Sequence, residues 1–354
     1  MCGIVGYIGQ RNALPIVIEA LKRLEYRGYD SSGTALIHND ELQVYKKQGK
    51  IIELERSLPE PSKCDGTIAI AHTRWATHGE PNEENAHPHL DCSGDLAIVH
   101  NGIIENYKLL REQLTELGHK FLSTTDTEVL SHLIEQFLTS EMSLEDAVRE
   151  SMKRVEGTYG LVVISKNDPD KLIAVRKGSP LIIGINDNEH FIASDVSAIV
   201  IHTKRVIYLQ DGELCIVRKD GFEITTLDKH NVKPQISVVD WDISAIEKGE
   251  FKHFMLKEIF EQPLTITNGF RGRINENMGT ARLGGLNLPS FELRKIKQIH
   301  LIACGTSFHA ALIGKYVIED IARIPVHAEY ASEYRYRNPI IPEDTLVFVI
   351  SQSG

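Results

Sequence analysis

The first nine residues place a cysteine directly behind the initiator methionine and then mix glycines with branched aliphatic side chains. Methionine is readily trimmed before a small residue, so Cys2 can become the N-terminus and carry a thiol and a free α-amine together. An α-amine has a pKa of about 7.7–8.0 and can serve as the base for its own side-chain nucleophile. The glycine spacing predicts a buried strand that other backbone approaches closely. The alternative is that Cys2 is an ordinary small side chain at a chain end.

Composition excludes several classes of protein. The 354 residues are 42% hydrophobic and 25% charged, which is globular and long enough for two domains. A net charge of −10 with both signs mixed argues against a nucleic-acid-binding protein. No stretch approaches the roughly 18 apolar residues of a membrane helix, and the start lacks a signal-peptide pattern. We therefore expect no membrane partner and no nucleic-acid partner.

The five cysteines are scattered and none forms a C-x-x-C pair, so metal and redox motifs have no support. We expect no metal, no cofactor and a reducing, cytoplasmic compartment. The cysteines are Cys2, Cys64, Cys92, Cys215 and Cys304.

Hydrophobic periodicity up to about residue 217 predicts a layered α+β domain with stacked sheets. The first helix should end at Arg27-Gly28 through a left-handed glycine, and Asn39-Asp40 should turn between two strands. The predicted helices are Ala13–Tyr26, Tyr107–Leu117 and Asp126–Phe137. The predicted strands are Thr34–His38, Leu42–Lys46, Thr67–His72, Leu96–His100, Leu161–Ser165, Leu172–Arg176, Leu181–Ile183, Phe191–Ser194, Val206–Leu209 and Glu213–Val217.

The pattern changes after Asp228, where periodicity fades into a predicted linker that runs to Glu250. A helix from Phe251 to Phe260 should be broken at Gln262-Pro263, or this pair should mark the next helix. From about residue 291 strands alternate with a helix, which is typical of a doubly wound parallel sheet. Such a domain needs more strands than this, so we expect the chain to be part of a longer protein. The expected elements are strands Gln298–Cys304, Val326–Tyr330 and Thr345–Ile350 and a helix at about Phe308–Ala322.

Several motifs have a chemical and a structural interpretation. Arg74 could bind a carboxylate through two hydrogen bonds, or it could stack on Trp75 at the surface. Asp126 could hold an ammonium group or cap a helix, and Asn101-Gly102 alone is a common turn. Hydroxyls where strands meet helix N-termini suit a phosphate, with simple helix capping as the alternative. These last residues are Thr306, Ser307, Ser351, Gln352 and Ser353.

In this order the motifs resemble the class II, N-terminal-nucleophile glutamine amidotransferases. Within that class the sequence is similar to the glutamine:fructose-6-phosphate aminotransferase family. The class motifs are Met-Cys-Gly-Ile-Val-Gly at the start, Arg-Trp-Ala-Thr-His-Gly from Arg74, His-Asn-Gly from His100 and Thr-Thr-Asp-Thr-Glu from Thr124. The family motifs are Tyr26–Ser31, Phe254–Ile259 with Glu261–Pro263, Ala303–Ser307 and Ser351–Gly354.

The resemblance implies an N-terminal-nucleophile hydrolase fold, an αββα sandwich of antiparallel sheets, followed by the start of a sugar-isomerase (SIS) domain. The implied domains are residues 2–240, a linker with connecting helices at 241–290, and 291–354. The implied substrates are L-glutamine and D-fructose 6-phosphate, with glucosamine 6-phosphate as product and a homodimer when the protein is longer. The residues for isomerisation would lie beyond Gly354, so this chain should retain only the glutaminase reaction.

The resemblance also implies site roles. Cys2 would attack the glutamine amide and form a thioester, and Asn101 and Gly102 would stabilise the oxyanion. Arg74 would bind the glutamine α-carboxylate and Asp126 its α-ammonium. The remaining roles are a glutamine pocket completed by Thr77 and His78, site closure by Trp75, support by Arg27 (or only a helix end there), a pocket position for His87, and sugar-phosphate binding by Thr306, Ser307, Ser351, Gln352 and Ser353.

Two other functions remain open at the sequence level. One is another class II amidotransferase, such as the phosphoribosyl-diphosphate enzyme, although Cys304-Gly305-Thr306-Ser307 is not a pyrophosphate loop. The other is a non-catalytic regulator that binds a sugar phosphate, which would result if Met1 were not removed. The intact mass of the protein distinguishes the regulator from the enzyme.

Overall fold

The computed structural model describes residues 2–60, 63–76, 79–138, 141–239, 251–271, 273–275, 279–281 and 290–351. The chain divides into two compact units, Met1–Lys257 and Glu258–Gly354, and each is described by itself. The domain limits expected at 240 and 290 adjoin residues outside the described ranges, so the three-part division stays a prediction. Among the described residues, no helix is both long and apolar enough to cross a membrane.

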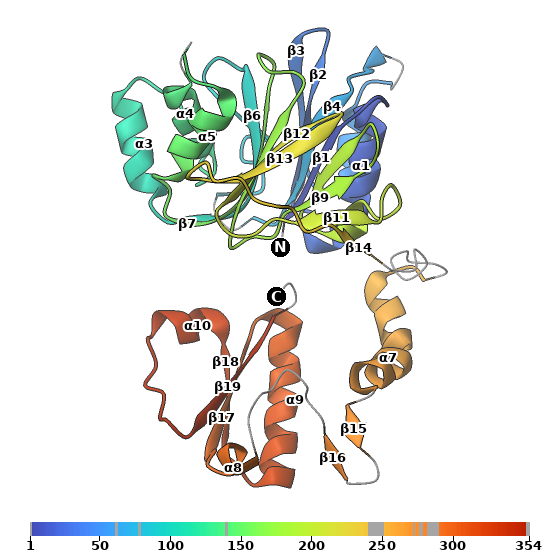
Figure 1. Cartoon of the computed structure of the whole chain (residues 1–354), viewed down its shortest axis with the longest axis vertical. Helices are drawn as coiled ribbons and strands as arrows, with labels where there is room; N and C mark the ends of the chain where they lie inside the picture. The colour runs from blue at the N-terminus through green and yellow to red at the C-terminus, as the bar shows by residue number, and fades with distance from the viewer. Residues whose placement is uncertain are drawn as a thin grey trace. The chain divides into compact units, whose positions relative to one another are not determined.

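The first unit contains two stacked antiparallel sheets (Figure 1). One has eight strands in the order β14-β11-β9-β10-β1-β4-β2-β3, and the other has six in the order β13-β12-β8-β7-β6-β5. The strands of the first sheet are β1 (Gly3–Ile8), β2 (Ser31–His38), β3 (Glu41–Gln48), β4 (Ile68–Arg74), β9 (Ile182–Ile185), β10 (His190–Ala193), β11 (Arg205–Tyr208) and β14 (Ser237–Val238). Those of the second are β5 (His89–Leu90), β6 (Leu96–Ile104), β7 (Gly157–Ser165), β8 (Leu172–Lys177), β12 (Glu213–Arg218) and β13 (Gly221–Thr226).

Alternation along β1 explains why this strand is buried on both faces. Ile4 and Ile8 face the core between the two sheets, where they pack with residues of β6 and β7. Val5 and Tyr7 point to the opposite face and pack against a helix. Successive side chains of a strand point to opposite faces, so a central strand covered on both sides has to be apolar at nearly every position. The predicted buried strand is confirmed.

Helices cover both outer faces of the stacked sheets (Figure 1). Helices α1 (Ala13–Leu24) and α2 (Ile51–Ser57) pack on the eight-stranded sheet. Helices α3 (Tyr107–Glu116), α4 (Glu128–Phe137) and α5 (Leu144–Met152) pack on the six-stranded sheet. The arrangement is the αββα sandwich that the sequence predicted.

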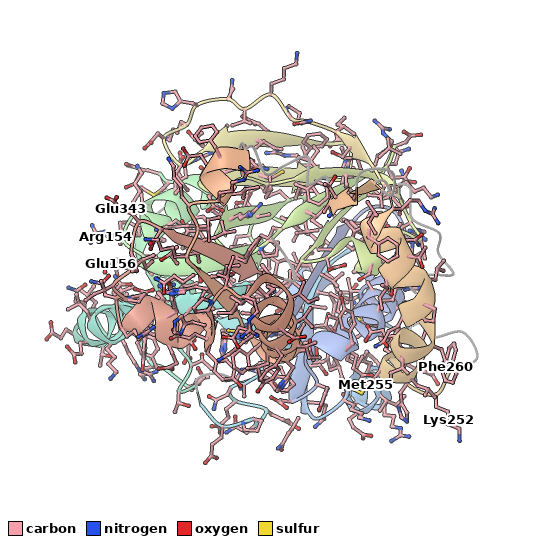
Figure 2. The ribbon with its side chains drawn as sticks, turned by 90° about the horizontal axis from the view of Figure 1, so that it is seen from below. Arg154, Glu156, Lys252, Met255, Phe260 and Glu343 are labelled. Carbon is pink, nitrogen blue, oxygen red and sulfur yellow. The ribbon has the colours of Figure 1, made fainter. Side chains whose placement is uncertain are left out.

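The turn between α5 and β7 fixes the end of β6, the strand that carries Asn101 and Gly102. Its exposed residues Arg154 and Glu156 are labelled in Figure 2. The Arg154 carbonyl accepts a hydrogen bond from the Asn106 side chain at 2.9 Å, and the Glu156 carbonyl accepts one from the backbone N–H directly after β6 at 2.8 Å.

One predicted helix end is wrong. Helix α1 stops at Leu24 and continues as a short 3-10 helix, η1 (Glu25–Arg27), and Gly28 has an extended φ of −178° rather than a left-handed one. Gly28 is needed for another reason: a Cβ there would lie 2.9 Å from the carbonyl carbon of Arg74. Its carbonyl also accepts a short hydrogen bond from Thr73 Oγ1. Close approach to β4 therefore explains this glycine.

The second unit begins a parallel sheet, as predicted. Strand β17 (Gln298–Ala303) pairs in parallel with β18 (Val326–Tyr330) on one side and β19 (Thr345–Ile350) on the other. Helix α9 (Gly305–Ala322) packs on this sheet through Ala311. The smaller elements are α8 (Ser290–Leu293), α10 (Ala331–Tyr336), β15 (Ile274–Asn275) and β16 (Thr280–Ala281).

The predicted break at Pro263 is wrong, because α7 (Phe254–Phe270) continues through it. Proline removes one N–H from the helical ladder. Two hydroxyls just beyond it bond to backbone carbonyls, Thr265 to Gln262 at 3.3 Å and Thr267 to Pro263 at 2.7 Å. Met255, close to the start of the helix, is 68% exposed (Figure 2).

We expect Leu21→Ala to lower the free energy of unfolding by about 2–5 kcal/mol, because a fully buried leucine leaves both lost transfer energy and a cavity. Leu109→Ala is the matched control, since Leu109 is 55% exposed on a helix and should cost under about 0.5 kcal/mol. Urea denaturation of the two variants measures both values. Equal losses would show that α1 is not packed as described.

Candidate active site

The register between β1 and β4 places Cys2 next to the segment that follows β4. Gly3 pairs with Thr73, so the residue before Gly3 lies across from Arg74. The backbone N–H of Trp75 donates to Cys2 Sγ at 3.2 Å, and the thiol lies 3.6 Å from the Trp75 carbonyl oxygen. Residues 73 positions apart in sequence thus meet at the Cys2 thiol.

Burial raises the pKa of the Cys2 thiol, and the Trp75 N–H and the Arg74 charge offset part of that rise. A thiol with a raised pKa is protonated at neutral pH, so an attack on an amide requires a base that takes its proton. Met1 lies outside the described residues.

Asn101 is held beside Cys2 by a buried histidine. His72 Nε2 lies 3.1 Å from the His100 carbonyl oxygen and 3.0 Å from Asn101 Oδ1, so this nitrogen carries the hydrogen. The amide oxygen of Asn101 is thereby turned toward His72, and its Nδ2 donates to the Cys2 carbonyl at 3.1 Å. Because Nδ2 carries two hydrogens, a second donor remains on the side chain next to Cys2.

The backbone N–H of Gly102 points to the side of β6 that faces away from β7. The N–H of His100 donates to His87 Nδ1, and that of Ile104 donates to Asp126 Oδ2, so the N–H groups of the even-numbered residues point away from β7. Alternation along an antiparallel strand directs the Gly102 N–H to that side as well. Gly102 has a φ of +137°, and a Cβ there would collide with the Thr158 carbonyl oxygen, so only glycine fits.

Arg74 is 4% exposed at the end of β4, which excludes simple stacking on a surface tryptophan. Its guanidinium donates to the carbonyls of Glu80 at 3.3 Å and Gly79 at 3.5 Å. Burial lowers the pKa of Arg74 while the neighbouring Cys2 and Asp126 act to raise it. An arginine stays charged under such conditions and can attract an anion into the site.

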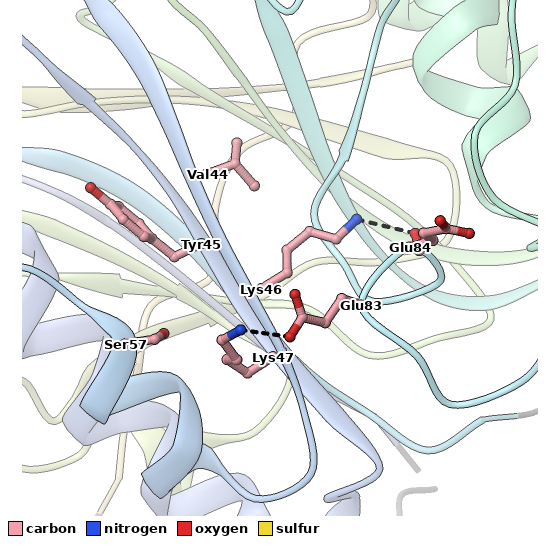
Figure 3. Close-up of a pocket in the computed structure, with 7 residues that line it drawn as sticks. All are labelled: Val44, Tyr45, Lys46, Lys47, Ser57, Glu83 and Glu84. Atoms are coloured by element: carbon pink, nitrogen blue, oxygen red, sulfur yellow. Dashed lines mark hydrogen bonds and ion pairs between the residues drawn. The ribbon is translucent and has the colours of Figure 1, made fainter.

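The loop that contains Gly79 and Glu80 forms a hydrogen bond and an ion pair with strand β3 of the β2–β3 hairpin (Figure 3). Lys46 Nζ donates to the Glu84 carbonyl at 3.2 Å, and Lys47 forms an ion pair with Glu83 at 2.6 Å. Burial lowers the pKa of Lys46 to about 8. A cavity of about 520 Å³ lies here, larger than the one at Cys2, so cavity size does not locate the site.

Asp126 does not cap a helix. The residue before α4 is Thr127, and Asp126 Oδ2 instead accepts the Ile104 N–H at 2.9 Å. Its second oxygen remains able to accept from a cation, and the side chain is only 5% exposed. Glu128 shapes the adjacent loop by accepting the backbone N–H groups of Leu122 and Ser123, both at 2.7 Å. Burial would raise the pKa of Glu128, but these bonds and His132 lower it to about 2.

Buried histidines form the wall of the site. His72 and His87 stack with ring centroids 4.1 Å apart, and burial lowers the pKa of His72 to about 3. Burial and the neighbouring histidines hold the pKa of His87 well below its usual range. The wall is therefore neutral at physiological pH. The small cavity that these groups surround encloses about 30 Å³ and is lined by Cys2, Arg74, Trp75, His87, His100, Gly102, Thr125, Asp126 and Thr127.

The remaining predicted residues of this unit are less fully described. Trp75 is 47% exposed, and its ring contacts that of Tyr29 edge-on with the ring centroids 5.9 Å apart. Arg27 lies in η1, but its side chain is outside the described part of the structure. Thr77 and His78 are also outside it.

The predicted sugar-phosphate residues lie at one edge of the parallel sheet. Thr306 and Ser307 are in the first turn of α9, directly after β17, and Ser351 directly follows β19. Since β17 and β19 run parallel with Ala303 beside Ile350, both strand ends meet at the same edge. Gln352 and Ser353 lie outside the described residues.

Sequence reasoning missed two groups that hold the site together. His72, two residues before Arg74, orients the Asn101 amide. Asn85 accepts the Thr124 N–H at 2.8 Å and donates to the Glu80 carbonyl at 2.9 Å, which joins the loops of Arg74 and Asp126. Asn85 stands two residues before His87 in the sequence, and that proximity was the available signal.

We expect stability to fall as pH drops from about 6.5 toward about 3, because the pKa of His72 is lower in the folded chain than in the unfolded chain. The unfolded chain then binds the proton first, and the loss is up to about 1.4 kcal/mol per pH unit for one group. Urea denaturation at about pH 5 and about pH 7.5 should show a smaller pH dependence for His72→Gln. Leu21→Ala, the control, should keep the wild-type pH dependence, and an unchanged slope in His72→Gln would contradict the assignment.

Comparison with known protein families identifies both units. The model of the glutamine amidotransferase domain matches residues 72–201, and that of the SIS domain matches residues 292–354. The chain is similar to the enzyme of purine biosynthesis described as allosteric and regulatory, with 30% identity and a TM-score of 0.56 over 64% of this chain and 49% of that one. The phosphoribosylpyrophosphate amidotransferase of B. subtilis shares the fold, with 22% identity and a TM-score of 0.58 over 97% of this chain and 69% of that one.

The glutamine–fructose-6-phosphate aminotransferase (isomerizing) of Chlorobaculum tepidum is 50% identical over all of this chain and 58% of that protein. This chain spans about 58% of the length of the first curated relatives that it matches. The antiparallel sandwich and the parallel strands after it agree with these matches. The chain therefore consists of a glutamine amidotransferase domain followed by the beginning of an SIS domain, and along its whole length it is similar to the glutamine–fructose-6-phosphate aminotransferases.

Proposed function

We propose that the first unit hydrolyses glutamine with Cys2 as its nucleophile. The observation that carries this proposal is the shared cavity, in which the Cys2 thiol, the Arg74 guanidinium and the Asp126 carboxylate come together beside Gly102. A thiol between an anion-binding and a cation-binding group suits a substrate with an α-carboxylate and an α-ammonium.

The reaction follows from the donors around Cys2. Removal of Met1 frees the α-amine, which takes the thiol proton as sulfur attacks the amide carbon of glutamine. The developing oxyanion accepts hydrogen bonds from the Gly102 N–H and from the second Asn101 hydrogen. Ammonia then leaves with a proton returned by the amine, and water hydrolyses the γ-glutamyl thioester to glutamate.

Two ionic contacts select free glutamine over a peptide-bound residue. Arg74 binds the α-carboxylate, and Asp126 binds the α-ammonium through the oxygen that does not accept from Ile104. A peptide lacks these charged ends and would leave both buried groups unpaired. Thr77 and His78 in the glutamine pocket, Trp75 in closing it, Arg27 in supporting it and His87 in its wall stay predictions from the family resemblance.

For the longer protein we infer the formation of glucosamine 6-phosphate from fructose 6-phosphate, with ammonia passed from Cys2 to the sugar site. The first turn of α9 and the end of β19 offer hydroxyls and helix N–H groups at one sheet edge, which suits the sugar phosphate. The relatives' name and their greater length support this inference. A homodimer and a cytoplasmic location remain predictions of the same resemblance.

The SIS match disfavours an enzyme that acts on phosphoribosyl diphosphate, because the parallel strands after residue 291 match an SIS domain. A purely regulatory sugar-phosphate binder would have no use for a thiol beside Arg74 and Asp126.

We expect Cys2→Ala to abolish glutamine hydrolysis without unfolding the protein, because the nucleophile is lost while the strand behind it stays intact. A glutamine-mimicking electrophile, 6-diazo-5-oxo-norleucine, should add once to wild type at an N-terminal Cys2 that lacks Met1. Mass spectrometry locates the adduct, glutamine should protect against it, and Cys304→Ala should label normally. Activity in a folded Cys2→Ala protein would refute the assignment.

Asn101→Ala and Asp126→Asn should separate catalysis from binding. Loss of one oxyanion donor should lower kcat by about 10²–10³-fold with little change in KM. Asp126→Asn keeps an oxygen for the Ile104 N–H but loses the charge, so KM for glutamine should rise more than kcat falls. Steady-state release of glutamate measures both parameters. A rise in KM for Asn101→Ala and a fall in kcat for Asp126→Asn would contradict the roles assigned to the two residues.

A further inference from the structure

A second cluster of chemically active side chains lies outside the candidate active site, where the loop after β5 meets the α3–α4 layer. It consists of Cys92, His119, His132 and Glu135, whose ligand atoms all lie within 4.8 Å of one another. Cys92 comes from the loop between β5 and β6, and His119 follows α3. His132 and Glu135 stand three residues apart on α4. We propose that these four side chains bind a Zn²⁺ ion.

Four of the six distances between ligand atoms agree with a tetrahedral zinc site, and the other two pairs lie within 4.8 Å. Zinc binds sulfur at about 2.3 Å and nitrogen or oxygen at about 2.0–2.2 Å, so neighbouring ligands lie about 3.5 Å apart for S–N and about 3.4 Å for N–O. Cys92 Sγ lies 3.6 Å from His119 Nδ1 and 3.4 Å from His132 Nδ1. Glu135 Oε2 lies 3.0 Å and 3.4 Å from the same two nitrogens. Four edges of the tetrahedron are thus present to within about 0.4 Å.

The far nitrogen of each histidine faces an oxygen. His119 Nε2 lies 2.9 Å from Gln136 Oε1, and His132 Nε2 faces Glu128 Oε1 at 3.6 Å. The His119 Nε2 therefore carries the hydrogen and its Nδ1 turns a lone pair into the cluster, whereas the His132 Nε2 is buried beyond hydrogen-bond distance of Glu128. Metal-binding histidines are held in this way by an oxygen of the outer shell.

Without a cation, two acceptors of the cluster face each other. Glu135 Oε2 and His119 Nδ1 both accept hydrogen bonds, yet they lie only 3.0 Å apart. The Cys92 N–H donates to Glu135 at 3.0 Å, and the Lys120 N–H donates to Cys92 Sγ at 3.5 Å. The Lys120 donor also suits a thiolate. A divalent cation is the partner that satisfies all four groups.

The ligand types select the metal. One sulfur, two imidazoles and one carboxylate suit zinc and disfavour magnesium or calcium, which prefer oxygen alone. Four protein ligands close the coordination shell, so the role is structural rather than catalytic. The ion would join three segments of the chain, one of which is α4, whose first residue, Glu128, shapes the loop that carries Asp126. Cys92 is exposed, which allows the ion to enter.

The test uses the full chain, purified without a histidine tag, treated with a chelator and re-equilibrated with Zn²⁺. Elemental analysis should find one zinc per chain, and Co²⁺ in its place should show the visible bands of a tetrahedral thiolate complex. Cys92→Ser and His119→Gln should weaken zinc binding at least about 100-fold, more than loss of an outer-shell partner in Gln136→Leu, at about 10–100-fold. Zn²⁺ should raise the unfolding temperature of wild type but not of Cys92→Ser.

Two matched cysteine variants complete the test. Cys304→Ser and Cys2→Ala should each retain one zinc, and circular dichroism should show that all variants are folded. If Cys92→Ser does not fold, Gln136→Leu decides, because it leaves all four ligands in place. Wild type without tight zinc, or a zinc affinity that stays at the wild-type value in Cys92→Ser or in Gln136→Leu, would overturn the proposal. Loss of zinc in Cys2→Ala would also overturn it by placing the ion at the nucleophile.

Discussion

Antiparallel pairing of β1 with β4 sets Gly3 opposite Thr73, and the geometry at Cys2 depends on this register. A slip of one residue would turn Val5 and Tyr7 toward the other sheet and remove them from α1, so burial on both faces holds the register. The same pairing carries Trp75 to the thiol, because Trp75 directly follows β4. The geometry around Cys2, the proposed nucleophile, is thus a consequence of core packing.

The buried groups around Cys2 are mostly neutral, and few of them carry a charge. The stacked ring pair of His72 and His87 is buried, and desolvation keeps both rings uncharged at physiological pH. Their hydrogen bonds therefore orient neighbours without competing for a charged substrate. Arg74 and Asp126 provide the charge, each fixed by backbone partners. Such preorganised dipoles are effective because they need no rearrangement during the reaction.

Local sequence patterns predicted the elements well where burial and periodicity agreed, as in β1 and in the strands of the parallel sheet. They failed where a residue serves a distant contact. Gly28 indicated a left-handed helix cap, but its real task is to let β4 approach. Pro263 indicated a break, yet α7 continues through it. Asp126 resembled a helix cap because it precedes a helix, but its carboxylate accepts a hydrogen bond from the backbone N–H of Ile104 instead.

By itself the sequence determined the position of Cys2, the candidate nucleophile, the family motifs and the alternation of apolar residues, since each of these is a local property of neighbouring positions. Only the tertiary structure decided which residues meet. His72 reaches Asn101 across 29 positions, and no pattern of spacing announces that contact. The four residues of the proposed zinc site lie on three separate segments with no recognisable spacing, which is why the sequence pattern predicted no metal. Long-range contacts follow from how sheets and helices stack, and stacking depends on the whole core rather than on any one segment.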